Sequence, residues 1–284
     1  MILSAMPERG SDSWLARWLG ARRDVSGVES AVWLTAALAV FIAPILGGSI
    51  AAQMPETVIG DADSVRRIAA TQLAGFGLAL VVGVVMVGLL RRGAGAGADR
   101  AGLTIGPMDP VRGAVWLAAI VPLYVLVSRG ATWVDRAVRG ERGETIQHET
   151  LKRLSAAFEG SGGEDRAWAW VVVASVVVLV PAVEEILYRG FLQSLFVRVL
   201  APGGGRGAGG RWGAIAATSV VFALMHVATG VVPWSAGVAL LTLSIALGVA
   251  FERTGRLGVP IVMHALFNAA NVAVVAFGGL SASS

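Results

Sequence analysis

One short stretch of this chain holds three ionisable residues that could do chemistry. Glu184, Glu185 and Arg189 fall within six positions of an otherwise apolar run. A charged side chain near the centre of a bilayer costs roughly 2.5–3.5 kcal/mol on insertion scales. Three such side chains would cost on the order of 7–10 kcal/mol if they stayed unpaired. The cluster therefore predicts a functional site inside a membrane.

Helical geometry separates the two glutamates. Glu185 and Arg189 are four residues apart with the acid first, which is the favoured order for a helical ion pair. Glu184 lies about 100° around the helix and has no local cation. We expect Glu184 to be the catalytic carboxylate and general base, supported by Glu185 and Arg189. The alternative is that all three form a purely structural ion network.

Two of the three histidines lie in apolar segments. His226 follows Phe222 by one helical turn, and His264 precedes Asn268 by one turn. Polar groups in lipid face the interior of a helical bundle, so the three helices should turn these side chains toward one another. The alternative is that each histidine only forms hydrogen bonds between helices.

The third histidine, His148, lies in a charged segment. Lys152 occupies the position where the zinc-binding pattern His-Glu-x-x-His needs a second histidine. We interpret His148 as a solvated loop residue.

Two chemistries fit the predicted site. Glu184, His226 and His264 could bind zinc and leave one coordination position for water. Without a metal, Glu184 and His226 could activate a water while His264 and Asn268 donate hydrogen bonds to an oxyanion. Both routes lead to hydrolysis of an acyl bond, and the sequence does not choose between them.

The composition indicates a polytopic membrane protein, because 55% of the residues are hydrophobic and only 15% are charged. We predict an all-α bundle of about seven transmembrane helices, within a range of six to eight. Pro181 lies inside the fourth apolar segment and predicts a kink or a break there. The predicted segments are 30–53, 68–90, 111–128, 167–198, 212–230, 234–251 and 258–279.

Charge and cysteine content exclude several classes of protein. The arginines lie between apolar runs and form no stripe, which argues against nucleic acid as a partner. Their distribution predicts a cytoplasmic N-terminus. The chain has no cysteine, so it has no disulfide, no thiolate nucleophile and no cysteine-based metal site.

Three regions follow from this pattern. Residues 1–29 form a cytoplasmic N-terminal segment, in which Trp14 and Trp18 share a face and predict a short interfacial helix. Residues 30–166 hold N-terminal membrane helices and a polar loop at 129–166. Residues 167–279 carry the predicted site.

The motifs Glu184-Glu185-x-x-x-Arg189, Phe222-x-x-x-His226 and His264-x-x-x-Asn268 resemble those of a known family of intramembrane proteases. This is the CAAX protease and bacteriocin-processing family, also called CPBP or Abi, which is related to the type II CAAX prenyl endopeptidases. The flanks are similar too, with Pro181 before the glutamates and Arg-Thr-Gly-Arg-Leu at 253–257. The resemblance covers roughly residues 167–279.

This resemblance implies an intramembrane endopeptidase of a bacterial cell membrane, with a membrane protein or peptide as its substrate. It implies that Glu184 and His226 prepare the water and that His264 and Asn268 complete the site. Family members are described both as metalloproteases and as metal-independent glutamate proteases, so zinc stays open. The alternatives are a non-catalytic scaffold or a bacteriocin immunity or secretion factor on the same fold. A transporter is a further alternative, although the sequence shows no inverted repeat.

Overall fold

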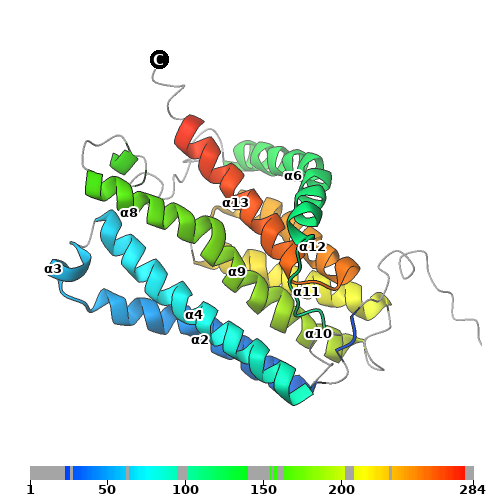
Figure 1. Ribbon diagram of the computed structural model, residues 1–284. Coiled ribbons are helices and arrows are strands. Elements are labelled where there is room, and N and C mark those ends of the chain that lie inside the picture. The colour runs from blue at the N-terminus through cyan, green and yellow to red at the C-terminus, as the bar shows by residue number, and fades with distance from the viewer. Residues whose placement is uncertain are drawn as a thin grey trace, which may run out of the picture.

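The fold is a helical bundle, shown in Figure 1. The computed structural model describes residues 23–25, 28–61, 64–94, 101–139, 154, 156–158, 163–201, 208–229 and 232–278. Within these ranges all regular secondary structure is helical, which confirms the predicted all-α class. The helices are α2 (Ser30–Ala52), α3 (Glu56–Ile59), α4 (Val65–Ala94), α6 (Asp109–Arg139), α8 (Gly163–Ala174), η1 (Ser175–Leu179), α9 (Val180–Glu185), η2 (Ile186–Leu192), α10 (Gln193–Leu200), α11 (Ala208–Ala228), α12 (Trp234–Thr254) and α13 (Gly258–Gly278).

The chain is an integral membrane protein. Among the described residues, 6 helices are long and apolar enough to cross a membrane, and Gly258–Val274 of α13 is a shorter apolar helix. The seven predicted segments therefore each coincide with a helix, and six spans lie within the predicted range. The cytoplasmic position of the N-terminus stays a prediction.

One long helix, made of α8, η1, α9, η2 and α10 in succession, lies in the middle of the bundle (Figure 1). We call it the central helix. Helices α2 and α4 pack against it from one side, whereas α11 and α13 pack against it from the other. Helix α12 lies against α11 and α13, and α6 covers α12 and α13. This order places the acidic stretch of the central helix inside the protein.

The helices α2 and α4 approach each other closely because small residues line their contact. A Cβ atom added at Gly75 of α4 would lie 2.8 Å from the carbonyl oxygen of Pro44 in α2. Small residues at such crossings allow backbones to pack tightly, which provides much of the association between helices in lipid. The pair forms a wall that supports the central helix.

The central helix does not break at Pro181. It continues through the proline, but its hydrogen bonds change register in the two π-helical stretches η1 and η2. A π-helical turn pairs each N–H with the carbonyl five residues earlier, and such turns are frequent at functional sites. Both stretches flank the two glutamates on α9. The predicted break is therefore replaced by a change of register.

The helix α6 is longer than its predicted apolar segment. It continues to Arg139, so the first part of the predicted polar loop at 129–166 is helical. This stretch contains no proline, and the Trp234 Nε1–H of α12 donates to Asp135 Oδ1 at 2.8 Å, which ties it to the bundle. The predicted segment was shorter than the helix, because apolar residues mark only the part of a helix that lies in the hydrocarbon layer, and the helix can continue into water. Helix α6 also bends in Figure 1, and Pro122 lies inside it.

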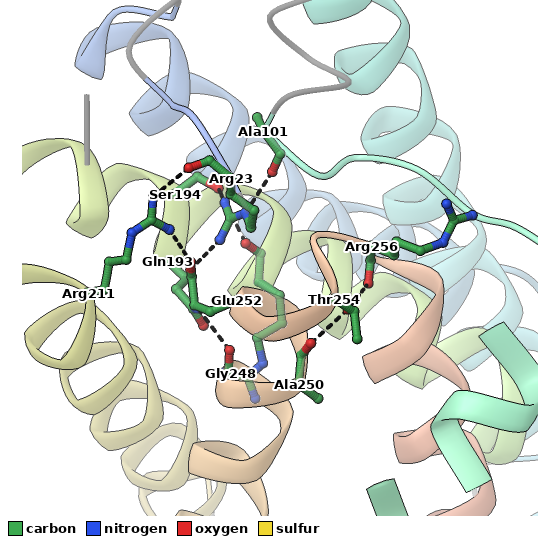
Figure 2. A network of polar contacts seen from close by, with 11 residues as sticks. Arg23, Ala101, Gln193, Ser194, Arg211, Gly248, Ala250, Glu252, Thr254 and Arg256 are labelled. Carbon is green, nitrogen blue, oxygen red and sulfur yellow. Dashed lines mark hydrogen bonds and ion pairs between the residues drawn. The ribbon is translucent and has the colours of Figure 1, made fainter. Parts of the chain in front are cut away.

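The N-terminal segment is attached to the bundle by Arg23, whose side chain is buried at the centre of the network in Figure 2. Its Nη1 donates to Glu252 Oε1 of α12, and its Nη2 donates to Ser194 Oγ of α10. Its Nε donates to the Ala101 carbonyl at 2.8 Å, and the guanidinium lies 3.8 Å from the Phe251 ring centroid. One side chain thus connects three separate elements.

Glu252 is the acceptor that this network shares. Besides Arg23, it accepts hydrogen bonds from Arg211 of α11 and from Gln193 Nε2, the latter at 2.9 Å (Figure 2). Burial lowers the pKa of Arg23 to about 10, while the Glu252 carboxylate opposes that shift. Arg23 therefore stays cationic at neutral pH. The predicted interfacial helix around Trp14 and Trp18 lies outside the described residues.

The segment between α4 and α6 is attached to the turn between α12 and α13. Gly255 ends α12 in the left-handed conformation, with φ of 63°. The Leu257 N–H then donates to the Gly102 carbonyl at 3.0 Å, and Arg256 Nε donates to Asp109 Oδ1 at 2.7 Å. The Arg-Thr-Gly-Arg-Leu sequence is thus a helix cap that positions the start of α13.

Candidate active site

The predicted residues meet between three helices. Glu184 and Glu185 come from the last turn of α9, His226 comes from α11, and His264 comes from α13. Arg189 follows in η2. The side chains from the central helix, α11 and α13 lie close together inside the bundle, as the sequence predicted.

Glu185 is the structural anchor of the group. Arg189 Nε donates to Glu185 Oε2 at 3.0 Å, and both side chains are fully buried. The predicted ion pair between positions 185 and 189 is therefore formed. His264 Nδ1 lies 2.9 Å from Glu185 Oε1, and Arg189 Nη2 donates to Ser244 Oγ of α12 at 3.0 Å. Glu185 and Arg189 thereby connect the central helix to α12 and α13.

The partners of the two histidines define their tautomers. His226 Nδ1 lies 2.8 Å from the Phe222 carbonyl, which can only accept, so Nδ1 carries the hydrogen. His264 Nδ1 likewise faces the Glu185 carboxylate and donates to it. In both rings Nε2 is therefore the atom left to face the site.

Glu184 lies opposite both Nε2 atoms. Its Oε1 is 3.8 Å from His226 Nε2, and its Oε2 is 3.8 Å from His264 Nε2. These separations are too long for a direct hydrogen bond. They leave the carboxylate close to two imidazoles without direct bonds to either. A small polar molecule such as water could bridge these groups.

Accessibility separates the two glutamates, which the sequence distinguished only by their ion pairing. The side chains of Glu184 and His226 are 16% and 19% exposed, whereas the Glu185 and Arg189 side chains are 0% exposed. Glu184 and His226 are therefore accessible to a comparable degree, whereas Glu185 and Arg189 are not. This difference favours a chemical role for Glu184 and a supporting role for Glu185.

Phe222 holds the two imidazoles apart. Its ring centroid lies 4.4 Å from that of His226 and 5.9 Å from that of His264. Tyr188 packs edge-on against Phe222 at 5.0 Å, and the Arg189 guanidinium lies 5.6 Å from the Phe222 centroid. The aromatic residue one turn before His226 therefore defines the positions of three site residues.

Asn268 makes a contact that the sequence did not predict. Its Nδ2 donates to the Val176 carbonyl of η1 at 2.9 Å. The expectation was that Asn268 would donate to an oxyanion together with His264. An amide nitrogen carries two hydrogens, and one of them is occupied by this contact.

Zinc binding by Glu184, His226 and His264 stays a prediction. In the part of the chain that the structure describes, no group of three or more His, Cys, Asp or Glu side chains could hold a metal ion. The two separations of 3.8 Å between Glu184 and the imidazoles are wider than the roughly 3.4 Å expected between two ligand atoms of tetrahedral zinc. His148 lies outside the described residues.

Sequence reasoning missed the residues that connect the site to α12. Ser244, Gly248 and Glu252 recur every four residues on that helix and meet Arg189 and Gln193 of the central helix. Their spacing in an apolar segment is a polar stripe, which is the signal that could have revealed them.

Comparison with known proteins supports the family. Residues 166–270 match the family described as Type II CAAX prenyl endopeptidase Rce1-like. The match confirms the predicted resemblance and includes every residue of the predicted site. It begins one residue before the predicted region 167–279 and ends inside α13. No curated protein and no solved structure matches the chain.

Proposed function

We propose, on the premise that residues 166–270 belong to this family of CAAX-type membrane proteases, that the protein is an intramembrane endopeptidase. It hydrolyses a peptide bond of a membrane-associated protein or peptide. One observation carries the proposal. The accessible Glu184 carboxylate faces two imidazole Nε2 atoms, each at 3.8 Å, inside a bundle of apolar helices.

Glu184 and His226 would activate the attacking water. A water between them can donate one hydrogen to a Glu184 oxygen and the other to His226 Nε2, because His226 Nδ1 already donates to Phe222. The water oxygen then attacks the peptide carbonyl, and the abstracted proton passes to the leaving amine. The two acceptors orient the water as well as remove its proton.

His264 would act on the other side of the carbonyl. Its Nδ1 donates to Glu185, whose carboxylate would balance the charge of a protonated imidazole. Nε2–H could then donate to the oxyanion that forms on the peptide carbonyl. Arg189 orients Glu185 by donating to its other oxygen. In this scheme water is activated without a metal.

Purified protein in liposomes provides the test. Wild type, Glu184→Gln and His226→Gln would be incubated with a library of membrane peptides that includes prenylated CAAX-type peptides, and products would be identified by mass spectrometry. Loss of one catalytic acid or base should reduce cleavage by roughly 100-fold or more. Glu164→Gln is the matched control, because Glu164 lies at the start of the same long helix and its side chain is 72% exposed.

The same assay addresses zinc and the alternatives. Cleavage that survives a chelator, in protein without bound metal, would support the metal-free scheme, whereas stoichiometric zinc and chelator-sensitive cleavage would overturn it. If Glu184→Gln cleaves as wild type does, the proposed chemistry is wrong. If the variant loses cleavage but keeps the cellular phenotype, a scaffold or immunity role would gain support. Solute flux into proteoliposomes would favour a transporter.

A further inference from the structure

The central helix loses one backbone hydrogen bond just before the site. In η1 the Val180 N–H donates to the Ser175 carbonyl, five residues earlier. If this register continued, residue 181 would donate to the Val176 carbonyl. Residue 181 is a proline and has no N–H. The Val176 carbonyl therefore lacks this backbone donor within an apolar helix, where unsatisfied polar groups are costly.

The side chain of Asn268 supplies a donor to this carbonyl. Asn268 Nδ2 lies 2.9 Å from the Val176 oxygen, and the hydrogen bond connects α13 to η1. Helix α13 packs along η1 and α9, so the bond lies within an established helix contact. Pro181 thus leaves a carbonyl of the central helix without a backbone donor, and the Asn268 side chain of α13 donates to that carbonyl.

This bond lies near the site on both helices, and the proline that frees its acceptor is one turn from Glu184. Asn268 follows His264 by four residues on α13, and Pro181 precedes Glu184 by three residues on α9. Shifting α13 along the central helix would change the distance between His264 Nε2 and Glu184 Oε2, which is 3.8 Å here. The bond between α13 and η1 opposes such a shift.

We propose that Pro181 and Asn268 form a positioning pair. Pro181 frees the Val176 carbonyl, Asn268 binds it, and the resulting bond holds His264 opposite Glu184. The inference rests on the proposed endopeptidase function for its catalytic consequence, but the coupling between the two residues does not depend on any activity. Asn268 then acts through His264, while the second hydrogen of its amide is not used by this bond.

A double-mutant cycle tests this pair. Asn268→Leu removes the donor while it keeps the branched shape and the number of side-chain heavy atoms, and Pro181→Ala restores a backbone N–H that can reach Val176. In full-length protein in detergent, Asn268→Leu alone should lower the apparent Tm by roughly 2–6 °C, because it leaves a carbonyl without its donor. In the Pro181→Ala background the same substitution should cost less than half of that shift. Equal shifts in the two backgrounds would overturn the coupling.

Cleavage kinetics test the positioning role. Asn268→Leu should lower kcat by about tenfold or more with KM changed less than about threefold, because substrate binding is retained while His264 is displaced. Adding Pro181→Ala should recover at least about threefold of the lost kcat. If the double variant is as slow as Asn268→Leu, the bond to Val176 does not determine kcat and the positioning role is wrong.

Asn271→Leu is the matched control. Asn271 is an exposed residue of the same helix, and its Nδ2 donates to the Phe267 carbonyl of its own helix at 3.0 Å. This substitution should leave Tm and kcat unchanged in both backgrounds. A protein in which no variant and no wild type cleaves any peptide would contradict the proposed function, yet the Tm cycle would still decide whether Pro181 and Asn268 are coupled.

Discussion

At the scale of single residues, Glu184 and Glu185 are neighbours in the chain with different surroundings. Glu185 accepts from Arg189 and His264 and is closed off from solvent, whereas Glu184 is partly accessible and faces both Nε2 atoms without a direct bond. The difference comes from the rotation of about 100° between successive helical residues. One residue can therefore hold the site while the next performs its chemistry.

These different surroundings predict that the same substitution at the two positions affects different properties, namely stability at Glu185 and cleavage at Glu184. Glu185→Gln leaves the buried Arg189 guanidinium without its carboxylate, so it should lower the free energy of unfolding by about 3–5 kcal/mol. Glu184→Gln should change stability by less than about 1 kcal/mol while it removes cleavage. Unfolding of both variants in detergent would be followed by circular dichroism. A Glu185→Gln protein as stable as wild type would contradict the anchoring role of Glu185.

At the scale of the helices, the contact between α2 and α4 supports the central helix. One close approach is at Gly75, where an added Cβ would come within 2.8 Å of the Pro44 carbonyl oxygen. The Pro44 oxygen belongs to the backbone of α2, and the added Cβ would be bonded directly to the backbone of α4, so neither atom could move away by a side-chain rotation. The two helices would have to separate to make room for a side chain.

A pair of alanine substitutions on α4 tests this contact. Gly75→Ala should destabilise the protein by roughly 1–3 kcal/mol, because overpacking forces the backbones apart. Gly77→Ala is the control, since nothing lies within 4 Å of a Cβ added there. It should be neutral or should stabilise α4 by up to about 1 kcal/mol through helix propensity. The readout is the apparent Tm of each variant, and equal values would show that the helices are not in contact at Gly75.

At the scale of the whole molecule, the Glu252 network connects the N-terminal segment to the region that matches the family. Arg23 lies outside the residues that match the family, whereas Gln193, Arg211 and Glu252 lie within them. Gln193 is one turn from Arg189 on the central helix, so the network continues toward the site. The N-terminal segment is thus part of the same folded unit as the site.

The network predicts an order of stabilities. Glu252→Gln removes the carboxylate that both guanidinium groups share, so it should destabilise the protein by about 3–5 kcal/mol. Arg23→Gln leaves the contact between Arg211 and Glu252 in place and should cost less, about 1–3 kcal/mol. Arg92→Gln, at an exposed position of α4, is the control and should change stability by less than about 0.5 kcal/mol. Thermal unfolding that showed Arg23→Gln to be the more damaging change would contradict this order.

The sequence by itself determined the class of protein and predicted side chains that the structure brings together. Long apolar segments can satisfy their backbone hydrogen bonds in lipid only as helices, so each of the seven segments became a helix. The spacing of Glu185 and Arg189 on one helix was sufficient to predict their ion pair, because positions four residues apart are neighbours on a helical surface. The charges at 184–189 and the two histidines in apolar segments indicated the site because polar side chains are costly in lipid.

Only the tertiary structure decided the contacts between segments that are distant in the chain. The bond from Asn268 to Val176 depends on a local change of register in η1, and apolar periodicity carries no signal for such a change. The burial of Arg23 against Glu252 joins residues 229 positions apart, so no local spacing could reveal it. Likewise, the 3.8 Å separations around Glu184 result from how three helices pack. Helical spacing determines which side chains share a face, whereas packing between helices determines what each face meets.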